Sequence, residues 1–596
     1  MPSVVIFGAG IAGLTAAHYL AREKGYQVTL IELLNVPGGL ARSERDPVDK
    51  LPTEYSYRGM GPWYHNFFNL MQDVPTAKDS TVFETELSQP IRFLLAHDKS
   101  KTSESLKSVE LDGQDKIAVE GDFYQRLRLS WWDKAATIYL FAKTWCASDA
   151  RSQNEYTKMN ASEVLQKYLS PRAAHAMSQL FGPWVGTDSS RASLHHVAAF
   201  FRKNLMPGPP APYFHKGPPA FYQGDGSGWL FFNNAINESI FDPIVNELRS
   251  LGAKVMFNCK LYRLIWDSTE NRITGAEVIP TTLSNDGSAA ATATTVIAAD
   301  YYVLAINPYE TYTVLQRSPE LLASDRQLQQ FEHLVADTAH AQVSFRIAFT
   351  RKIKMCQRPV RVSPAIILLD SEYDITLFAP DELWKNSAYF GDGVQSLWSG
   401  TATLDQTRGA LYDLPLTELT KQQFIDEIMH QIYRCQDLIE MVAEYNDGLA
   451  LQEVPVKRVE VWKTWIFDGS KLQNSEKKWV NNSRNWEYQP SAVTSVPNLL
   501  LAGAHTKTNA DLYSMEAAAE SGRRVYDIVT DSNTVIPQHT NFILRIMKAI
   551  DAVFYQWLSL PNIIDVVIMI VVVVLLVAVI PKILSWSYGL KYNKTF

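Results

Sequence analysis

Three glycines close to the N-terminus have the spacing of a phosphate-binding loop. Gly8, Gly10 and Gly13 follow a short apolar run, residues 4–7, and precede a segment with helical periodicity. In such a loop the first glycine allows a tight turn, the second lets the backbone approach a pyrophosphate, and the third lets the helix pack on the strand. The residues predicted to contact a dinucleotide here are Gly8, Gly10, Ile11, Ala12 and Gly13.

A second predicted strand ends on an acidic residue. Residues 27–32 read QVTLIE, so Glu32 closes the strand that follows the helix. An acidic residue at this point accepts hydrogen bonds from a ribose. The alternative is a glycine-rich turn without a ligand, but strand, loop, helix, strand and acid together favour a nucleotide site.

A second glycine pair and an arginine follow directly. The segment LLNVPGGLARSERD contains Gly38, Gly39, Leu40 and Arg42. Pro-Gly-Gly forces a turn, and Arg42 follows it within reach of a phosphate. A plain NAD-dependent Rossmann enzyme has no need for this second element.

Near the end of the predicted globular part, an apolar strand leads into another helix. The sequence VPNLLLAGAHTKTNADLYSMEAAAESGRRVYDIV contains a glycine turn at Gly503 and a helix that begins near Ser514. We expect this second helix N-terminus to be aimed at the same ligand, because free N–H groups there favour negative charge.

Composition narrows the class of protein. A chain of 596 residues exceeds one ordinary core, and a net charge of −7 without a basic stripe argues against a nucleic-acid partner. The four cysteines are scattered and have no neighbouring histidine at metal-ligand spacing, so we expect reduced thiols and no metal site. The first strand begins within a few residues of Met1, which leaves no room for a secretory leader.

The C-terminal segments suggest a membrane. Residues 563–584 are apolar except near their ends, which predicts a transmembrane anchor, and residues 541–560 predict an amphipathic helix in the membrane interface. The expected apolar face of that helix contains Ile543, Ile546, Met547, Ile550, Val553, Phe554 and Trp557. We expect a single-pass protein whose main part faces the cytosol, on the endoplasmic reticulum or mitochondrial outer membrane if the source is eukaryotic.

The motifs together resemble those of the flavin-containing amine oxidase superfamily, which includes monoamine oxidases, phytoene desaturases and protoporphyrinogen oxidase. The resemblance rests on GAGIAGL with Glu32, on PGGLARS, and on NLLLAGAHTKTNADLYSMEAAAESGRR, and it runs in order from Met1 to Ile528. It implies FAD as cofactor. The binding is expected to be non-covalent, because LLLAGAHTKT has no counterpart of the cysteine that attaches FAD in monoamine oxidases.

The resemblance also implies roles for single residues. Gly8, Gly10 and Gly13 would face the pyrophosphate, Glu32 the adenosine ribose, Gly39 and Arg42 the diphosphate and ribityl chain, Leu261 the adenine, and Gly503, Met515 and Glu516 the flavin. Gly38, Leu40 and Ser514 are cofactor-binding candidates without a separate role. Gly61 and Pro62 are further candidates beside the flavin ring. His505 stands where relatives commonly have an acidic or aromatic residue, and its role is left open. No lysine aligns with the one that relatives place near flavin N5; Lys352 and Lys354 read as surface charges.

The expected fold class is α/β and α+β, with a Rossmann-type FAD-binding domain assembled from discontinuous segments, an inserted mixed substrate domain and a C-terminal transmembrane helix. The FAD-binding segments are 1–62, 229–308 and 454–531. The substrate domain consists of 63–228 and 309–453.

The predicted function is removal of a hydride from a C–H bond beside nitrogen or beside a C=C bond of a small lipophilic substrate, an amine or an isoprenoid. Electrons would pass to oxygen or a quinone, membrane lipid would be a partner, and no catalytic side chain or oligomeric state is assigned. Candidate pocket aromatics, which also fit an ordinary core, are Trp184, Trp462, Trp465, Trp486 and Tyr488. The alternative is a non-catalytic prenyl-binding protein resembling Rab GDP-dissociation inhibitors, which share this architecture.

Overall fold

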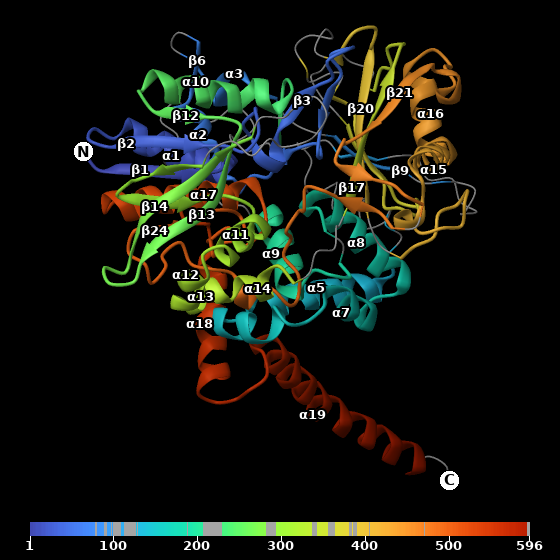
Figure 1. Cartoon of the computed structure of the whole chain (residues 1–596). Helices are drawn as coiled ribbons and strands as arrows, with labels where there is room; N and C mark the ends of the chain where they lie inside the picture. The colour runs from blue at the N-terminus through green and yellow to red at the C-terminus, as the bar shows by residue number, and fades with distance from the viewer. Residues whose placement is uncertain are drawn as a thin grey trace.

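The computed structural model contains two large sheets, several small two- and three-stranded ones, and a group of helices below the large sheets (Figure 1). It describes residues 1–77, 80–88, 92–96, 98, 109–111, 127, 129–187, 189–206, 229–281, 294–336, 342–355, 364–380, 384, 390–403, 406–469 and 471–592. The predicted loop at 207–228 and Cys356 lie outside the described residues.

The first sheet is parallel and is built from three distant parts of the chain. Its order is β12 (Lys254–Met256), β2 (Gln27–Ile31), β1 (Ser3–Phe7), β16 (Tyr301–Leu304) and β24 (Leu499–Leu501). The apolar runs predicted as strands bury their side chains, as a sheet covered on both faces requires. The prediction of a Rossmann-type sheet from discontinuous segments agrees with this order.

Helices α1 (Ile11–Arg22) and α17 (Met515–Thr530) pack against each other beside this sheet. The close approach depends on Gly522, because a Cβ there would lie 2.2 Å from the carbonyl oxygen of Ala12. The two chain ends of the predicted nucleotide-binding part are thereby joined through backbone contact.

The second sheet has seven strands in the order β10 (Val109–Leu111), β9 (Arg92–Ala96), β18 (Pro364–Leu368), β19 (Thr376–Phe378), β20 (Ser396–Thr403), β17 (Gln342–Phe349) and β21 (Val456–Val461). Helices α15 (Lys421–Arg434) and α16 (Gln436–Tyr445) lie beside it in Figure 1. Both predicted parts of the substrate domain contribute strands. Strand β21 belongs to it as well, although the sequence placed residues 456–461 in the third FAD-binding segment.

A helical group connects the sheets to the C-terminus. It contains α5 (Trp131–Cys146), α7 (Ala161–Tyr168), α8 (Pro171–Val185) and α9 (Leu194–Leu205), followed at the end of the chain by α18 (Phe542–Gln556) and α19 (Ile563–Tyr592). Figure 1 shows α18 against the underside of the molecule and α19 extending away from it. Among the described residues, no helix combines the length and apolar character needed to cross a bilayer. The predicted anchor falls on α19, whose side chains after Val577 lie outside the described residues.

Helix α18 differs from the predicted pattern in one important way. Asp551, which lies outside the expected apolar face, is completely buried and pairs with Arg151 at 3.0 Å. Met547 and Phe554, assigned to the apolar face, pack partly against Trp145 and neighbouring residues of the helical group. The remaining apolar residues form what we name the outer face of α18, exposed by 38–80%: Phe542, Ile543, Ile546, Ile550, Val553 and Trp557.

Candidate cofactor-binding site

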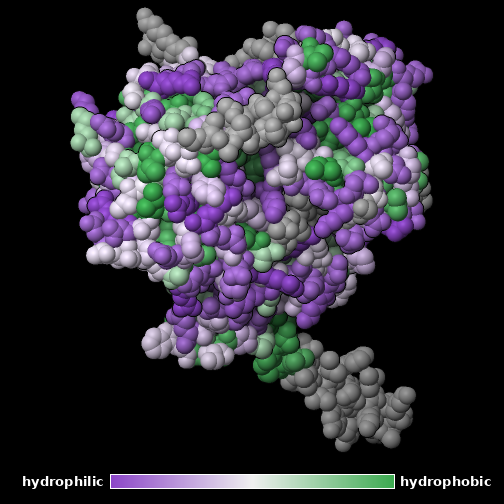
Figure 2. Space-filling view, in the orientation of Figure 1, coloured by the Kyte–Doolittle hydropathy of each residue, from purple (hydrophilic) through white to green (hydrophobic). Residues whose placement is uncertain are grey.

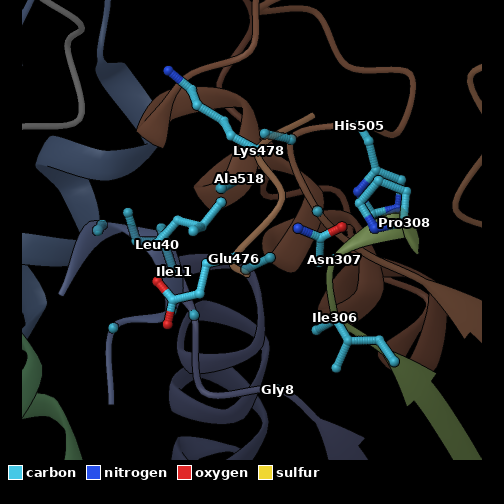
Figure 3. A pocket seen from close by; sticks show the side chains of 18 of the residues that line it. Gly8, Ile11, Leu40, Ile306, Asn307, Pro308, Glu476, Lys478, His505 and Ala518 are labelled. Atoms are coloured by element: carbon cyan, nitrogen blue, oxygen red, sulfur yellow. The ribbon is translucent and has the colours of Figure 1, made fainter. Parts of the chain in front are cut away.

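A cavity of about 600 Å³ opens at the carboxyl ends of the parallel strands (Figure 3). Its lining includes Phe7, Ile31, Ala305 and Gly503, each at or just after the end of a strand. Ligands in open α/β sheets bind at this edge. Residues from all three predicted FAD-binding segments and from the substrate domain meet around it. The predicted cofactor residues in its lining are Gly8, Gly10, Ile11, Ala12, Glu32, Gly38, Gly39, Leu40, Arg42, Leu261, Gly503, Ser514 and Met515.

The three glycines of the first loop have different structural roles. Gly8 has a φ of +104°, and a Cβ there would lie 2.4 Å from the carbonyl oxygen of Ala305. A Cβ on Gly13 would lie 1.9 Å from the carbonyl oxygen of Gly8, so this glycine permits helix packing and does not line the cavity. A Cβ on Gly10 would meet only the Cα of Gly39, at 3.9 Å. Gly10 is therefore the glycine whose small size leaves room for a ligand.

The second glycine pair lies directly against the first loop. Gly38 and Gly39 have φ values of +111° and +55°, and the Gly38 N–H donates to the Ala9 carbonyl at 2.7 Å. These left-handed conformations explain why the sequence has glycine at both positions. The backbones of the two loops thus form one wall.

Two helix N-termini face the cavity. Gly10 precedes α1 and gives it no side-chain cap, whereas Ser514 accepts a hydrogen bond from the Ala517 N–H at the start of α17 at 3.2 Å. An uncapped helix start leaves backbone N–H donors unpaired by side chains. The start of α1 therefore offers donors to an anionic group.

Glu32 is buried in the cavity wall. Its carboxylate accepts hydrogen bonds from the Ala9 N–H at 2.7 Å and the Leu34 N–H at 2.9 Å. Burial raises the pKa of Glu32, while these backbone donors act in the opposite direction. The acid is fixed between the glycine loop and the end of β2.

Arg42 lines the cavity but has its own acidic partners. It pairs with Glu44 at 2.9 Å and with Glu476, and it donates to the Gly39 carbonyl at 2.9 Å. Its guanidinium also lies 5.0 Å from the centre of the Trp462 ring. In this arrangement Arg42 stabilises the Gly38–Gly39 turn, and its charge is paired with the two glutamates.

Several predicted site residues do not line this cavity. They are Gly13, Gly61, Pro62, Trp462, Trp465, Trp486, Tyr488 and Glu516. Trp462 and Trp465 belong to the core beside the seven-stranded sheet, and Tyr488 packs against His333. Of the five predicted pocket aromatics, only Trp184 lines the cavity.

Glu516 is fully buried and joins two helices. It accepts hydrogen bonds from the N–H groups of Asn66 at 3.0 Å and Phe67 at 2.9 Å, in the first turn of α2 (His65–Asp73). Burial raises its pKa to about 7. Its motif position predicted a flavin contact, but the structure places it one layer behind the cavity.

The cavity also contains residues that the sequence did not indicate. Lys478 is 6% exposed, donates to the Gly186 carbonyl at 3.3 Å, and has a pKa lowered to about 7, mainly by burial and further by Arg58. Its sequence neighbours lack any recognisable motif, so only the fold could identify it. Lys352 and Lys354 do not line the cavity. Aromatic lining residues that the sequence did not single out are Tyr57, Tyr64, Tyr309, Tyr312 and Tyr513.

His505 lines the cavity as a neutral imidazole. It is 3% exposed, and burial lowers its pKa to about 3. Its ring lies close to Gly503, where an added Cβ would be 2.5 Å from Nδ1. The histidine therefore fixes the glycine turn after β24 against the cavity.

Comparisons with known proteins agree with this architecture. The family model of the NAD(P)-binding Rossmann-like domain matches residues 6–74, and no curated protein sequence matches the chain. An oxidoreductase from Methanosarcina mazei superposes with a TM-score of 0.55 at 11% identity, covering 88% of this chain and 100% of its own.

Two amine oxidases share the fold to a similar extent. Cyclohexylamine oxidase from Brevibacterium oxydans has a TM-score of 0.52 at 13% identity, and putrescine oxidase bound to putrescine has 0.54 at 12%. Each comparison covers 89% of this chain and 99% of the other. The fold expected from the three motifs is therefore confirmed: the chain has the fold of the amine oxidases.

Proposed function

We propose that this protein is an FAD-dependent oxidoreductase that binds its cofactor non-covalently in the 600 Å³ cavity. The observation that carries the proposal is the wall formed by Gly10 and Gly39, where backbone alone faces the cavity beside the uncapped start of α1. A pyrophosphate requires such close backbone approach and such N–H donors. The residues present thus fit the cofactor.

The far part of the cavity suits the reacting end of the cofactor. When bound, FAD supplies the acceptor for a hydride from the substrate. The N-terminus of α17, at Ser514 and Met515, directs its positive dipole end into the cavity, which favours negative charge there. Lys478 exchanges its proton near neutral pH, so its Nζ is suited to accept a proton from a substrate.

We further propose a small lipophilic substrate, oxidised at a C–H bond beside nitrogen or beside a C=C bond, with oxygen or a quinone as electron acceptor. The support is the aromatic lining of the cavity, which contains Trp184 and the tyrosines Tyr57, Tyr64 and Tyr513. Behind the lining, Trp184 packs against Trp229 and Phe378, with ring centres 4.6 and 5.5 Å from its own. Such walls exclude water and hold apolar groups.

The proposed location is a membrane surface, with α19 as anchor and the flavin domain in the cytosol. The support is an apolar surface at the base of the molecule. The outer face of α18 is exposed. The described side chains of α19 from Val567 to Val577 are exposed as well, and Figure 2 shows a hydrophobic region at the base of this helix. Exposed apolar patches of this kind mark lipid or protein contacts, and Arg545 and Lys548 on α18 suit an anionic lipid surface.

The test is the visible absorption spectrum of the detergent-purified protein before and after anaerobic addition of amines or isoprenoid lipids. An oxidised-flavin spectrum that is bleached by one class supports the enzyme and selects the chemistry. A colourless chain that cannot be reconstituted with FAD contradicts the proposal and favours the prenyl-binding alternative.

A further inference from the structure

Two histidines and an aspartate meet in a second region, away from the glycine loops. His195 and His196 lie in the first turn of α9, and Asp511 lies in the segment before α17. One potential ligand atom from each residue falls within 4.8 Å of the others. The group therefore joins the helical part of the substrate domain to the third nucleotide-binding segment.

The two imidazoles are oriented by serines. His195 Nδ1 is hydrogen bonded to Ser152 Oγ at 2.6 Å, and His196 Nδ1 to Ser193 Oγ at 2.7 Å. In both rings the opposite nitrogen, Nε2, is thus the one left for another partner. Metal-binding histidines characteristically have their second ring nitrogen fixed in this way.

The partners of the two Nε2 atoms differ. His195 Nε2 contacts Asp511 Oδ2, whereas His196 Nε2 is buried with no hydrogen-bond partner in the described part of the chain. The His196 side chain is 1% exposed. A buried polar atom without a partner is costly, and a bound ion would satisfy it.

The aspartate is held in place as well. Asp511 Oδ1 accepts a hydrogen bond from Trp486 Nε1 at 3.1 Å, and the residue has a φ of +48°. The carboxylate thus presents its other oxygen, Oδ2, to the histidines. Trp486 thus positions Asp511, whereas the sequence predicted that it lines the substrate pocket.

A separate cavity of about 340 Å³ lies beside the group. His195, Asp511, Ser152, Asn509 and Arg202 are among its lining residues. Three protein ligands next to open space are typical of a metal that keeps one position for water or another small ligand.

We propose that His195 Nε2, His196 Nε2 and the Asp511 carboxylate bind a divalent first-row transition metal ion, with a coordination position open to the 340 Å³ cavity. Imidazole and carboxylate ligands suit zinc and iron(II) among these metals. Binding separates His195 from Asp511, because ligand atoms around a tetrahedral ion with bonds of about 2.1 Å lie roughly 3.4 Å apart. Local spacing could not predict this site, since His195 and Asp511 are 316 residues apart.

Charged residues near the three ligands affect the affinity of this site for a metal ion. Arg202 and Lys203 follow the histidines on α9 and are attracted by Asp511, so they oppose a second cation. Glu516 and Glu520 are fully buried and, like Asp511, raise the pKa of Lys203. Asp149, paired with Lys548 at 2.6 Å, adds further negative charge beside Arg202.

The test uses the full-length protein with its flavin, purified in detergent without a histidine tag. After treatment with a chelator, Zn²⁺ is titrated by isothermal calorimetry and bound metal is counted by mass spectrometry. We expect one tightly bound Zn²⁺ per chain, and at least tenfold weaker binding in His196→Ala and Asp511→Asn. His430→Ala, which removes an exposed histidine of α15, is the matched control and should bind like the wild type.

Equal binding by wild type and His196→Ala, or no stoichiometric binding by either, overturns the proposal. The three residues are then a hydrogen-bonded network that fastens α9 to the segment before α17. His196→Gln provides a second variant of similar size in case alanine disturbs the fold, and circular dichroism reports folding in every sample. The metal site does not depend on the proposed redox function, so either can fail alone.

Discussion

Gly10 and Gly13 belong to one motif but have different physical tasks. Gly10 has φ −75°, open to any residue, and free space around its missing side chain. We predict that Gly10→Val leaves the fold intact but weakens flavin retention by about tenfold or more, equivalent to at least ~1.4 kcal/mol. The measurement is the ratio of flavin to protein absorbance, with circular dichroism as the folding check.

Gly13→Ala is the matched comparison. Its methyl group would lie 1.9 Å from a backbone carbonyl, so we expect the fold itself to lose about 1–3 kcal/mol, the usual cost of overpacking. Thermal unfolding of the two variants measures the difference. If Gly10→Val keeps its flavin in full, the pyrophosphate does not pass this wall.

Lys478 gives stability and activity a pH dependence. Its pKa is lowered to about 7 by burial, against about 10.4 in an unfolded chain. Between these values the unfolded chain binds more protons, so Lys478 makes the free energy of unfolding rise with pH from about 7 to about 10. Denaturant titration at several pH values should show a rise that is weaker in Lys478→Met.

The same substitution tests catalysis. We expect kcat/KM to increase as pH rises through about 7 in the wild type, because the neutral amine is the form that accepts a proton. That increase should disappear in Lys478→Met and persist in Lys471→Met, which alters an exposed lysine outside the cavity lining. An unchanged profile in Lys478→Met would exclude the lysine as a proton acceptor.

Helix α18 is part of the fold as well as a candidate membrane element. Asp551 accepts hydrogen bonds from Arg151, from the Ser148 N–H at 2.7 Å and from the Ile563 N–H at 3.1 Å. Asp551→Ala leaves Arg151 buried without this partner, so we predict a loss of about 3–5 kcal/mol. The exposed pair Lys548–Asp149 is the control, and Lys548→Ala should cost only about 0–1 kcal/mol in the same unfolding assay.

This helix shows what periodicity can and cannot predict. Its start, length and amphipathic character follow from local spacing, and the outer apolar residues are where the pattern placed them. The burial of Asp551, which lies outside the expected apolar face, could not be predicted because its partner Arg151 is 400 residues away. Residues 456–461 were placed in the third FAD-binding segment for the same reason, since the pairing of β21 with β17 is a long-range contact.

At the scale of the molecule, the nucleotide-binding half was more predictable than the rest. Gly8, Gly38 and Gly39 have positive φ angles, and because such conformations favour glycine, they can be recognised in the sequence. The substrate half has no comparable sequence motif. Trp184 lines the cavity while Trp465 lies in a core, and nothing local distinguishes the two; Lys478 enters the cavity without any motif.

The position of α18 also determines how the chain can be shortened. Asp565 pairs with Lys143 at 2.8 Å, so a chain ending at Val567 keeps α18 and this contact. We predict that this shortened chain folds, keeps its flavin and still binds phospholipid vesicles through the outer face of α18. Vesicle sedimentation is the measurement.

The double variant Ile543→Glu, Trp557→Glu should abolish vesicle binding by the shortened chain, because charges on an interfacial helix face are strongly disfavoured. The control is Leu411→Glu, which alters an exposed apolar residue that is not part of the C-terminal helices. The shortened chain with this substitution should bind vesicles as before. If the double variant still binds vesicles, another surface contacts the membrane.

The most direct test of the whole account is the visible spectrum of the purified full-length protein during anaerobic titration with amines and isoprenoid lipids. We expect the spectrum of oxidised flavin, which one substrate class bleaches, and release of free FAD when the protein is denatured. A protein that remains colourless after incubation with FAD would contradict the central claim.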